Sequence, residues 1–136
     1  LDNNNININH IENMKIVPYI YNMEEIMNVS DVIVARSGAM TITEIANIGK
    51  PAILIPLPNV SHDHQLYNAK VLEKINAAKI ILDNTLNGKI LNETIEEIIK
   101  DKEKMKKMGK QALTVGTSDV EEKIYTEVKK LVKKKI

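Results

Sequence analysis

The residues best suited to binding a ligand lie within Val32–Glu44, which has the sequence VIVARSGAMTITE. Its first residues form a continuous, β-branched apolar run that is typical of a strand buried on both faces, and Ala39 begins a helical pattern. Between them, Ser37 and Gly38 form a turn of small residues that leaves the first N–H groups of the helix uncovered. A helix N-terminus carries roughly +0.5 charge and free N–H donors, which suit a phosphate. We therefore predict that Ser37–Thr41 binds phosphate through backbone amides.

A carboxylate on the same helix offers a second polar contact. Ser37, Thr41 and Glu44 are spaced so that they share one helical face, opposite an apolar stripe. A carboxylate at this distance from the turn can accept hydrogen bonds from the two hydroxyls of a ribose. A second interpretation stays open here, in which Ser37 is only the N-cap and Glu44 is a solvated charge. Neither a P-loop nor a GxGxxG dinucleotide motif is present.

A second polar cluster lies in residues 61–68, with the sequence SHDHQLYN. His64, Gln65 and Asn68 fall on one edge of a predicted helix, and they offer donors and acceptors suited to sugar hydroxyls. The two histidines of this segment have no third ligand and no cysteine beside them, so the sequence does not favour a metal site. The GxSxG sequence of a hydrolase nucleophile is also absent around Ser37. We expect neither a metal nor another cofactor.

These candidate residues are held by alternating apolar strands and amphipathic helices. Such alternation favours an α/β fold, a parallel sheet with flanking helices and right-handed connections. Open parallel sheets bind ligands beyond the carboxyl ends of their strands, so we expect the loops 19–23, 36–41 and 56–65 to meet there. The predicted strands are Lys15–Ile20, Asp31–Arg36, Pro51–Leu57 and Ala78–Leu82, and the predicted helices are Asn22–Val29, Ala39–Ile48, His62–Ile75 and several from Asn87 onward, the last opened by a capping box at Ser118–Glu121.

The composition limits the remaining function classes. The chain has 136 residues, 43% hydrophobic and 27% charged, which fits one folded domain. It has no cysteine, and its aromatic residues amount to 3%, all tyrosine. With a formal net charge of +1, these features exclude a disulfide scaffold and argue against a nucleic-acid partner. No apolar run approaches the ~18 residues that span a bilayer, and the lack of cysteine and of a signal peptide fits the cytoplasm.

The two ends of the sequence differ from its middle. Residues 1–14 are Asn-rich and lack an apolar stripe, so we predict a loop or a truncated edge of the domain formed by residues 15–136. Because the sequence begins at Leu1, we expect it to be the C-terminal part of a longer protein. The lysine-rich end, residues 129–135, could contact anionic lipid, although a solvated basic helix end is favoured.

Four blocks of the sequence follow one another at suitable spacing: Pro18–Met23, Ala35–Glu44, His64–Ala69 and Asn76–Ile81. Together they resemble the MurG family of bacterial N-acetylglucosaminyltransferases. The resemblance implies two Rossmann-like halves in the GT-B arrangement, with this chain as part of the C-terminal, UDP-sugar-binding half. By this resemblance we expect the first strand and glycine-rich loop of that half to be missing, together with the N-terminal half, which in the family carries the acceptor site, the proposed base and the membrane contact.

The resemblance also implies roles for individual residues. The uracil would face the backbone of Ile20 and the side chain of Met23, and the ribose hydroxyls would be held by Glu44. His64 and Gln65 would contact the N-acetylglucosamine, where many family members have two glutamines. The predicted substrate-binding set is Ile20, Met23, Ser37, Gly38, Ala39, Met40, Thr41, Glu44, His64, Gln65 and Asn68, with Ala39, Met40 and Thr41 at the diphosphate.

The reaction implied for an intact family member takes N-acetylglucosamine from UDP-N-acetylglucosamine (UDP-GlcNAc) to lipid I. The product is lipid II, a precursor of peptidoglycan, and the enzyme would sit peripherally on the cytoplasmic face of the plasma membrane. No catalytic residue is expected in this chain, and we expect the chain alone to be inactive. The alternatives are a donor-binding subunit of a split UDP-sugar transferase, another GT-B enzyme such as a UDP-GlcNAc 2-epimerase or a glycolipid synthase, and an α/β domain without a ligand.

Overall fold

The computed structural model describes residues 11–59, 63–116 and 129 of the chain. Three short parallel strands form a sheet in the order β1-β2-β3. The register places Val34 beside Ile53 and Ile53 beside Lys79. Each strand connects to the next through a helix on the same face, which is the geometry of βαβ units. The strands are β1 (Ile33–Ala35), β2 (Ala52–Leu54) and β3 (Ala78–Ile80).

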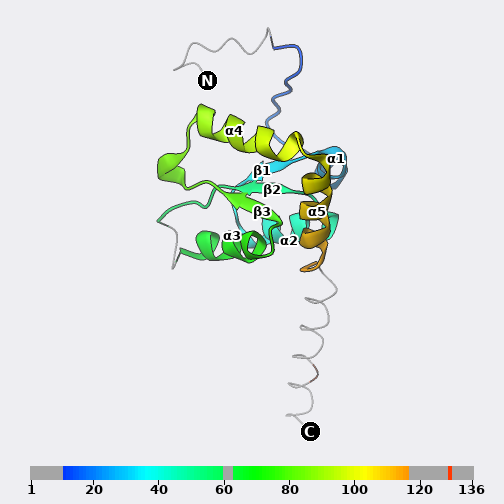
Figure 1. Cartoon of the computed structure of the whole chain (residues 1–136), viewed down its shortest axis with the longest axis vertical. Coiled ribbons are helices and arrows are strands. Elements are labelled where there is room, and N and C mark those ends of the chain that lie inside the picture. The colour runs from blue at the N-terminus through cyan, green and yellow to red at the C-terminus, as the bar shows by residue number, and fades with distance from the viewer. Residues whose placement is uncertain (1–10, 60–62, 117–128, 130–136) are drawn as a thin grey trace.

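The helices cover both faces of this sheet. Helix α4 lies on one face, and α2 and α3 lie on the other (Figure 1). Helix α1 packs against α2, while α5 contacts both α2 and α4. The predicted α/β fold with a parallel sheet and flanking helices is confirmed. The helices are α1 (Met23–Val29), α2 (Ala39–Ile48), α3 (His64–Lys74), the 3₁₀ turn η4 (Asp83–Thr85), α4 (Gly88–Ile99) and α5 (Lys102–Leu113).

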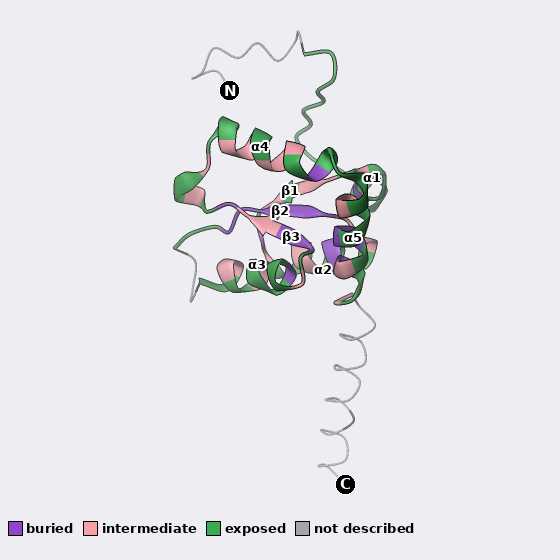
Figure 2. Cartoon of the chain, viewed as in Figure 1, coloured by how far each residue is buried: buried purple, intermediate pink, exposed green. Residues whose placement is uncertain are grey.

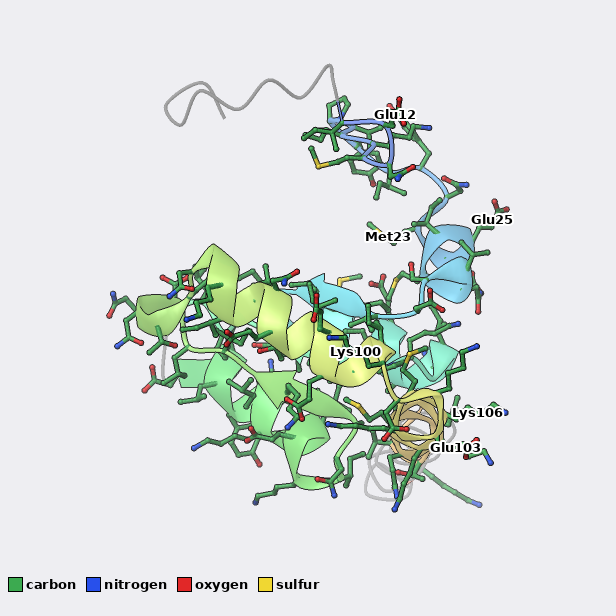
Figure 3. The ribbon with its side chains drawn as sticks, turned by 45° about the horizontal axis from the view of Figure 1, so that its top comes forward. Glu12, Met23, Glu25, Lys100, Glu103 and Lys106 are labelled. Atoms are coloured by element: carbon green, nitrogen blue, oxygen red, sulfur yellow. The ribbon has the colours of Figure 1, made fainter. Side chains whose placement is uncertain are left out.

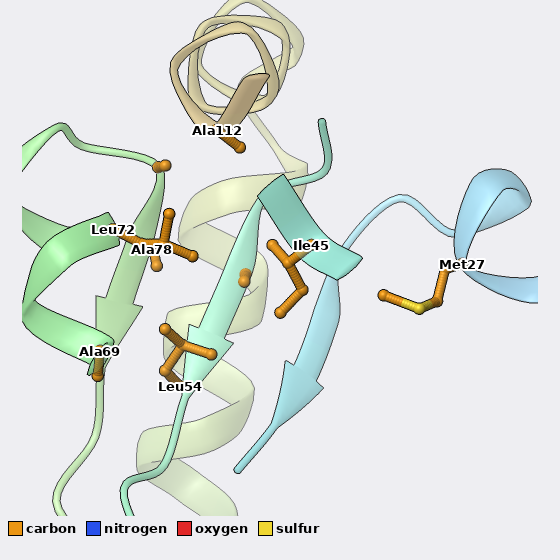
Figure 4. Packing of buried hydrophobic residues seen from close by; sticks show 9 residues of the cluster. Met27, Ile45, Leu54, Ala69, Leu72, Ala78 and Ala112 are labelled. Carbon is orange, nitrogen blue, oxygen red and sulfur yellow. The ribbon is translucent and has the colours of Figure 1, made fainter. Parts of the chain in front are cut away.

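The central strand β2 is the middle of the hydrophobic core, and buried residues gather along it (Figure 2). Side chains alternate across a strand, so Leu54 packs into the cluster under α2 and α3, whereas Ile53 packs under α4. In the first cluster Leu54 lies between Ile45 of α2 and Leu72 of α3 (Figure 4). Burial of both faces explains why this strand is a continuous apolar run.

Local signals in the sequence set the ends of several helices. Helix α2 ends at Gly49, whose φ of 70° is the left-handed conformation that glycine adopts without strain. The Gly49 N–H donates to the Ile45 carbonyl at 3.0 Å. The side chains of Asn87 and Asp101 cap α4 and α5 by accepting backbone N–H bonds of 2.9 and 3.0 Å. These ends fix the lengths of the helices that position the strand-end loops.

One predicted strand is absent. Residues 15–20 form no strand, so the prediction of a strand at Lys15–Ile20 was wrong. Ile16 is 52% exposed and therefore buries no face against the sheet, and Pro18 has no N–H to contribute to a ladder. The predicted capping box and last helix lie outside the described residues. Within the described part of the chain, no helix is both long and apolar enough to cross a bilayer.

Candidate functional site

The segments that follow the three strands meet at the carboxyl edge of the sheet. The turn after β1 is hydrogen-bonded to α3, and Arg36 reaches segments after both β2 and β3. This edge is where open parallel sheets bind ligands. The predicted loops 36–41 and 56–65 therefore do lie together where the structure describes them.

The N-terminus of α2 faces this edge without a side-chain cap. Gly38 is the N-cap residue, and the first turn of the helix contains no acidic residue. The Ile42 N–H donates to the Gly38 carbonyl at 3.1 Å, but the backbone N–H groups of Ala39, Met40 and Thr41 have no acceptor among the described residues. A Cβ built on Gly38 would meet no atom within 4 Å. The turn can therefore present three backbone donors and the positive helix end to an approaching anion.

The structure places Ser37 neither on the predicted outward face of α2 nor at its N-cap. It is fully buried, and its Oγ donates a 2.6 Å hydrogen bond to the Gln65 carbonyl of α3. Its own carbonyl accepts a 3.1 Å bond from the Asn68 side chain. Ser37 is thus neither the N-cap of α2 nor part of the outward face of Thr41 and Glu44, because its hydroxyl is committed to α3. A ligand could contact its backbone but not compete easily for its side chain.

A cavity of about 230 Å³ is lined by residues of α1 and α2. Met23, which projects from the start of α1 (Figure 3), and the exposed Glu44 both line it. These two residues are predicted to contact neighbouring parts of one nucleotide, and the fold brings them together. Ile20 is half-buried and does not line this cavity. The remaining lining residues are Glu24, Met27, Asn47 and Ile48.

The start of α3 forms the other side of the candidate site. Gln65 is half-buried, and its Oε1 accepts a 2.9 Å bond from the Leu57 N–H, which leaves its amide nitrogen without an acceptor among the described residues. His64 is exposed at the first position of the helix. The Asn68 side chain donates to the Ser37 carbonyl and so holds the turn. Amide groups fixed in this way can bind sugar hydroxyls.

Arg36 and Asp83 are not among the site residues predicted from the sequence. The Arg36 guanidinium forms an ion pair of 2.6 Å with Asp83, the first residue of η4. The same Nη1 donates to the Ile55 carbonyl at 3.3 Å. The available signal was that Arg36 is the chain's only arginine and directly precedes the turn. Among the described residues, no group of three or more histidine or carboxylate side chains could hold a metal ion.

Comparisons with known proteins identify the family. The family described as "Glycosyltransferase family 28 C-terminal domain" matches residues 2–124. The chain belongs to this family.

Relatives of this glycosyltransferase family 28 domain share one name, "UDP-N-acetylglucosamine–N-acetylmuramyl-(pentapeptide) pyrophosphoryl-undecaprenol N-acetylglucosamine transferase". The protein from Acetivibrio thermocellus is 40% identical over 123 residues, which is 90% of this chain and 33% of the relative. The protein from Desulforamulus reducens is 39% identical over 132 residues, 97% of this chain and 36% of the relative. The chain thus spans about a third of the length of the curated relatives it matches.

A solved structure supports the same assignment. The crystal structure of Acinetobacter baumannii MurG superposes with a TM-score of 0.69 and 32% identity, over 76% of this chain and 30% of that one. The parallel sheet with flanking helices therefore matches part of the C-terminal, Rossmann-like half of a GT-B glycosyltransferase. The resemblance to the MurG family and the predicted fold class are confirmed. The roles of individual site residues remain predictions.

Proposed function

We propose that this chain is the donor-binding part of an N-acetylglucosaminyltransferase that uses UDP-GlcNAc. The observation that carries the proposal is the uncapped N-terminus of α2, a helix that also contributes Glu44 to the cavity lined by Met23 and whose preceding turn is hydrogen-bonded to the start of α3. These three neighbouring sites match the three parts of a nucleotide sugar: nucleoside, diphosphate and hexose. The relatives share the name of a transferase, which favours a transferase over an epimerase that acts on the same nucleotide sugar.

Each part of the donor has a suitable chemical environment. The N–H groups of Ala39, Met40 and Thr41 would donate to diphosphate oxygens, and the helix dipole favours their negative charge. Glu44 would accept hydrogen bonds from the ribose hydroxyls, beside an apolar contact from Met23 to the uracil. The backbone of Ile20 would lie at the uracil edge.

The sugar would lie toward α3. Gln65 offers an amide nitrogen without an acceptor in the described part of the chain. His64 and Asn68 flank it on the same helix and present further polar groups. Ser37 and Gly38 would contribute through the backbone of the turn, because the Ser37 hydroxyl already donates to Gln65.

The same contacts would assist the transfer reaction. Negative charge develops on the leaving UDP as the bond from the sugar to the diphosphate breaks, and fixed amides near the β-phosphate stabilise that charge. No metal is needed at the diphosphate if the amides and helix dipole provide this stabilisation. In the proposed reaction the sugar passes to the C4 hydroxyl of the muramyl group of lipid I, which gives lipid II for peptidoglycan.

The rest of the reaction requires groups that we do not assign to this chain. Proton removal from the acceptor hydroxyl needs a base within hydrogen-bond reach, and we propose that a longer protein supplies it together with the lipid I site. That longer protein would act peripherally at the cytoplasmic face of the membrane. A binding subunit that pairs with a separate acceptor-binding chain would use the same donor contacts.

Calorimetric titration of the purified chain with UDP-GlcNAc, UDP, uridine and ADP tests the donor assignment. We expect both uracil nucleotides to bind, uridine to bind far more weakly because it lacks the diphosphate, and ADP to bind more weakly than UDP. Equal binding of uridine and UDP, or of ADP and UDP, would contradict the assignment. We also expect no lipid II from the purified chain supplied with UDP-GlcNAc and lipid I, and formation of lipid II by this chain alone would contradict the proposed division of labour.

A further inference from the structure

Arg36 connects the ends of all three strands. It follows β1 directly, and its Nη1 donates to the Ile55 carbonyl after β2 at 3.3 Å and to Asp83 Oδ1 after β3 at 2.6 Å. The side chains of Arg36 and Asp83 are 47% and 36% exposed, and exposed ion pairs contribute little to global stability. The contact is better suited to fixing local geometry, because two hydrogen bonds from one nitrogen hold the guanidinium in one orientation.

Arg36 also belongs to a closed ring of bonds that joins the turn before α2 to the first turn of α3. From Ile55 the chain runs to Leu57, whose N–H donates to Gln65 Oε1 at 2.9 Å. The Gln65 carbonyl accepts from Ser37 Oγ at 2.6 Å, and Ser37 is covalently joined to Arg36. We call the residues Arg36, Ile55, Leu57, Gln65 and Ser37 the strand-end ring. The ring ties the turn that opens α2 to the first residues of α3.

We propose that Arg36 and Asp83 are positioning residues that set the spacing between the N-terminus of α2 and the start of α3 through the strand-end ring. This inference rests on the proposed function, in which the α2 terminus holds the diphosphate and α3 contacts the sugar. UDP needs only the first of these contacts, whereas UDP-GlcNAc needs both at once. A change in this spacing therefore weakens the binding of UDP-GlcNAc more than the binding of UDP.

Replacement of Asp83 tests this role without removing a group that touches the ligand. We expect Asp83→Asn to weaken UDP-GlcNAc binding by about three- to fivefold, the upper part of the range for an exposed ion pair, and UDP binding by less than twofold. Asp83→Glu keeps the charge and should restore UDP-GlcNAc affinity to within twofold of wild type. Glu96→Gln removes the exposed ion pair with Lys100 on α4 and serves as the matched control with both affinities unchanged.

Two outcomes of the titration would overturn the inference. One is an Asp83→Asn variant with wild-type affinity for UDP-GlcNAc. The other is an equal loss for UDP and UDP-GlcNAc, with a lowered melting temperature, because that pattern describes general destabilisation rather than a changed spacing.

A ligand-free measurement separates this inference from the proposed function. Amide hydrogen exchange by NMR should show faster exchange at Leu57 and altered amide shifts at Ser37 and Gln65 in Asp83→Asn, but not in Glu96→Gln. If the wild-type chain binds no uracil nucleotide, the proposed function fails, and these amides still decide whether Asp83 holds the strand-end ring. Unchanged exchange and shifts would overturn the positioning role.

Discussion

Replacement of Glu44 by alanine should remove the ribose contact while leaving the fold intact. Glu44 is exposed on α2 and lines the cavity that it shares with Met23. Among the described residues it has no hydrogen bond or ion pair, so its loss breaks no contact of the fold, and alanine is the better helix former. A hydrogen bond to a charged group contributes about 1.5–3 kcal/mol. We therefore expect UDP-GlcNAc and UDP to bind about ten- to a hundredfold more weakly, with an unchanged melting temperature.

A second nucleotide makes this prediction specific to the ribose. The wild-type chain should bind 2′-deoxy-UDP more weakly than UDP, because one hydroxyl partner of Glu44 is missing. In Glu44→Ala the two nucleotides should bind alike, since residues in contact show non-additive effects. Glu93→Ala removes an exposed carboxylate from α4 and serves as the control. If Glu44→Ala still prefers UDP to the deoxynucleotide by the wild-type factor, Glu44 does not hold the ribose.

Three further predictions concern stability and binding conditions. Gly109→Ala should lower the free energy of unfolding in denaturant by about 1–3 kcal/mol, because the added Cβ would lie 2.5 Å from the Gly49 carbonyl oxygen. In the control Gly88→Ala the added Cβ would meet no atom within 4 Å, so the fold should not be destabilised. Equal effects of the two substitutions would refute the close contact. The hydrogen bond from Lys104 lowers the pKa of Glu97 in the folded state. Ionised Glu97 therefore stabilises the fold at pH values above the ordinary glutamate pKa of 4.5, and this stabilisation is lost as the pH falls through the lowered pKa. The difference in melting temperature between wild type and Glu97→Gln should therefore shrink from pH 7 to pH 3, and a constant difference would contradict this. UDP affinity should be the same in EDTA as in Mg²⁺, and a strong dependence on the metal would show that amides alone do not hold the diphosphate.

The helices and strands with clear periodicity could be predicted from the sequence. Helix α2 runs from Ala39 to Ile48 as expected, because its apolar stripe is regular and Gly49 ends it. The strand predicted at Lys15–Ile20 failed because an apolar run indicates a strand only where a neighbouring strand can pair with it, and these residues stay largely exposed. Local pattern specifies an element more reliably than it specifies that element's partner.

The elements of the candidate site could be predicted from the sequence, but the hydrogen bonds between them could not, and the ligand contacts stay predictions. The turn and Glu44 were visible because a strand, small residues and a helix follow one another within one short segment. The burial of Ser37 depends on Gln65, and the ion pair of Arg36 depends on Asp83, both far away in the sequence. Such contacts follow from the parallel order of the strands, which brings separate loops to one edge, and no spacing within a single segment encodes them.

The central claim is that the first turn of α2 holds the diphosphate of a uracil nucleotide. The most direct test is an NMR titration of the isotope-labelled chain with UDP, with uridine as the comparison. We predict that UDP produces its largest amide chemical-shift changes at Ala39, Met40 and Thr41. Uridine should leave the chemical shifts of these three amides unchanged while it still changes those of residues around Met23. UDP-induced shifts confined to another surface, such as the lysine-rich helix α5, with the three α2 amides unchanged, would contradict the account.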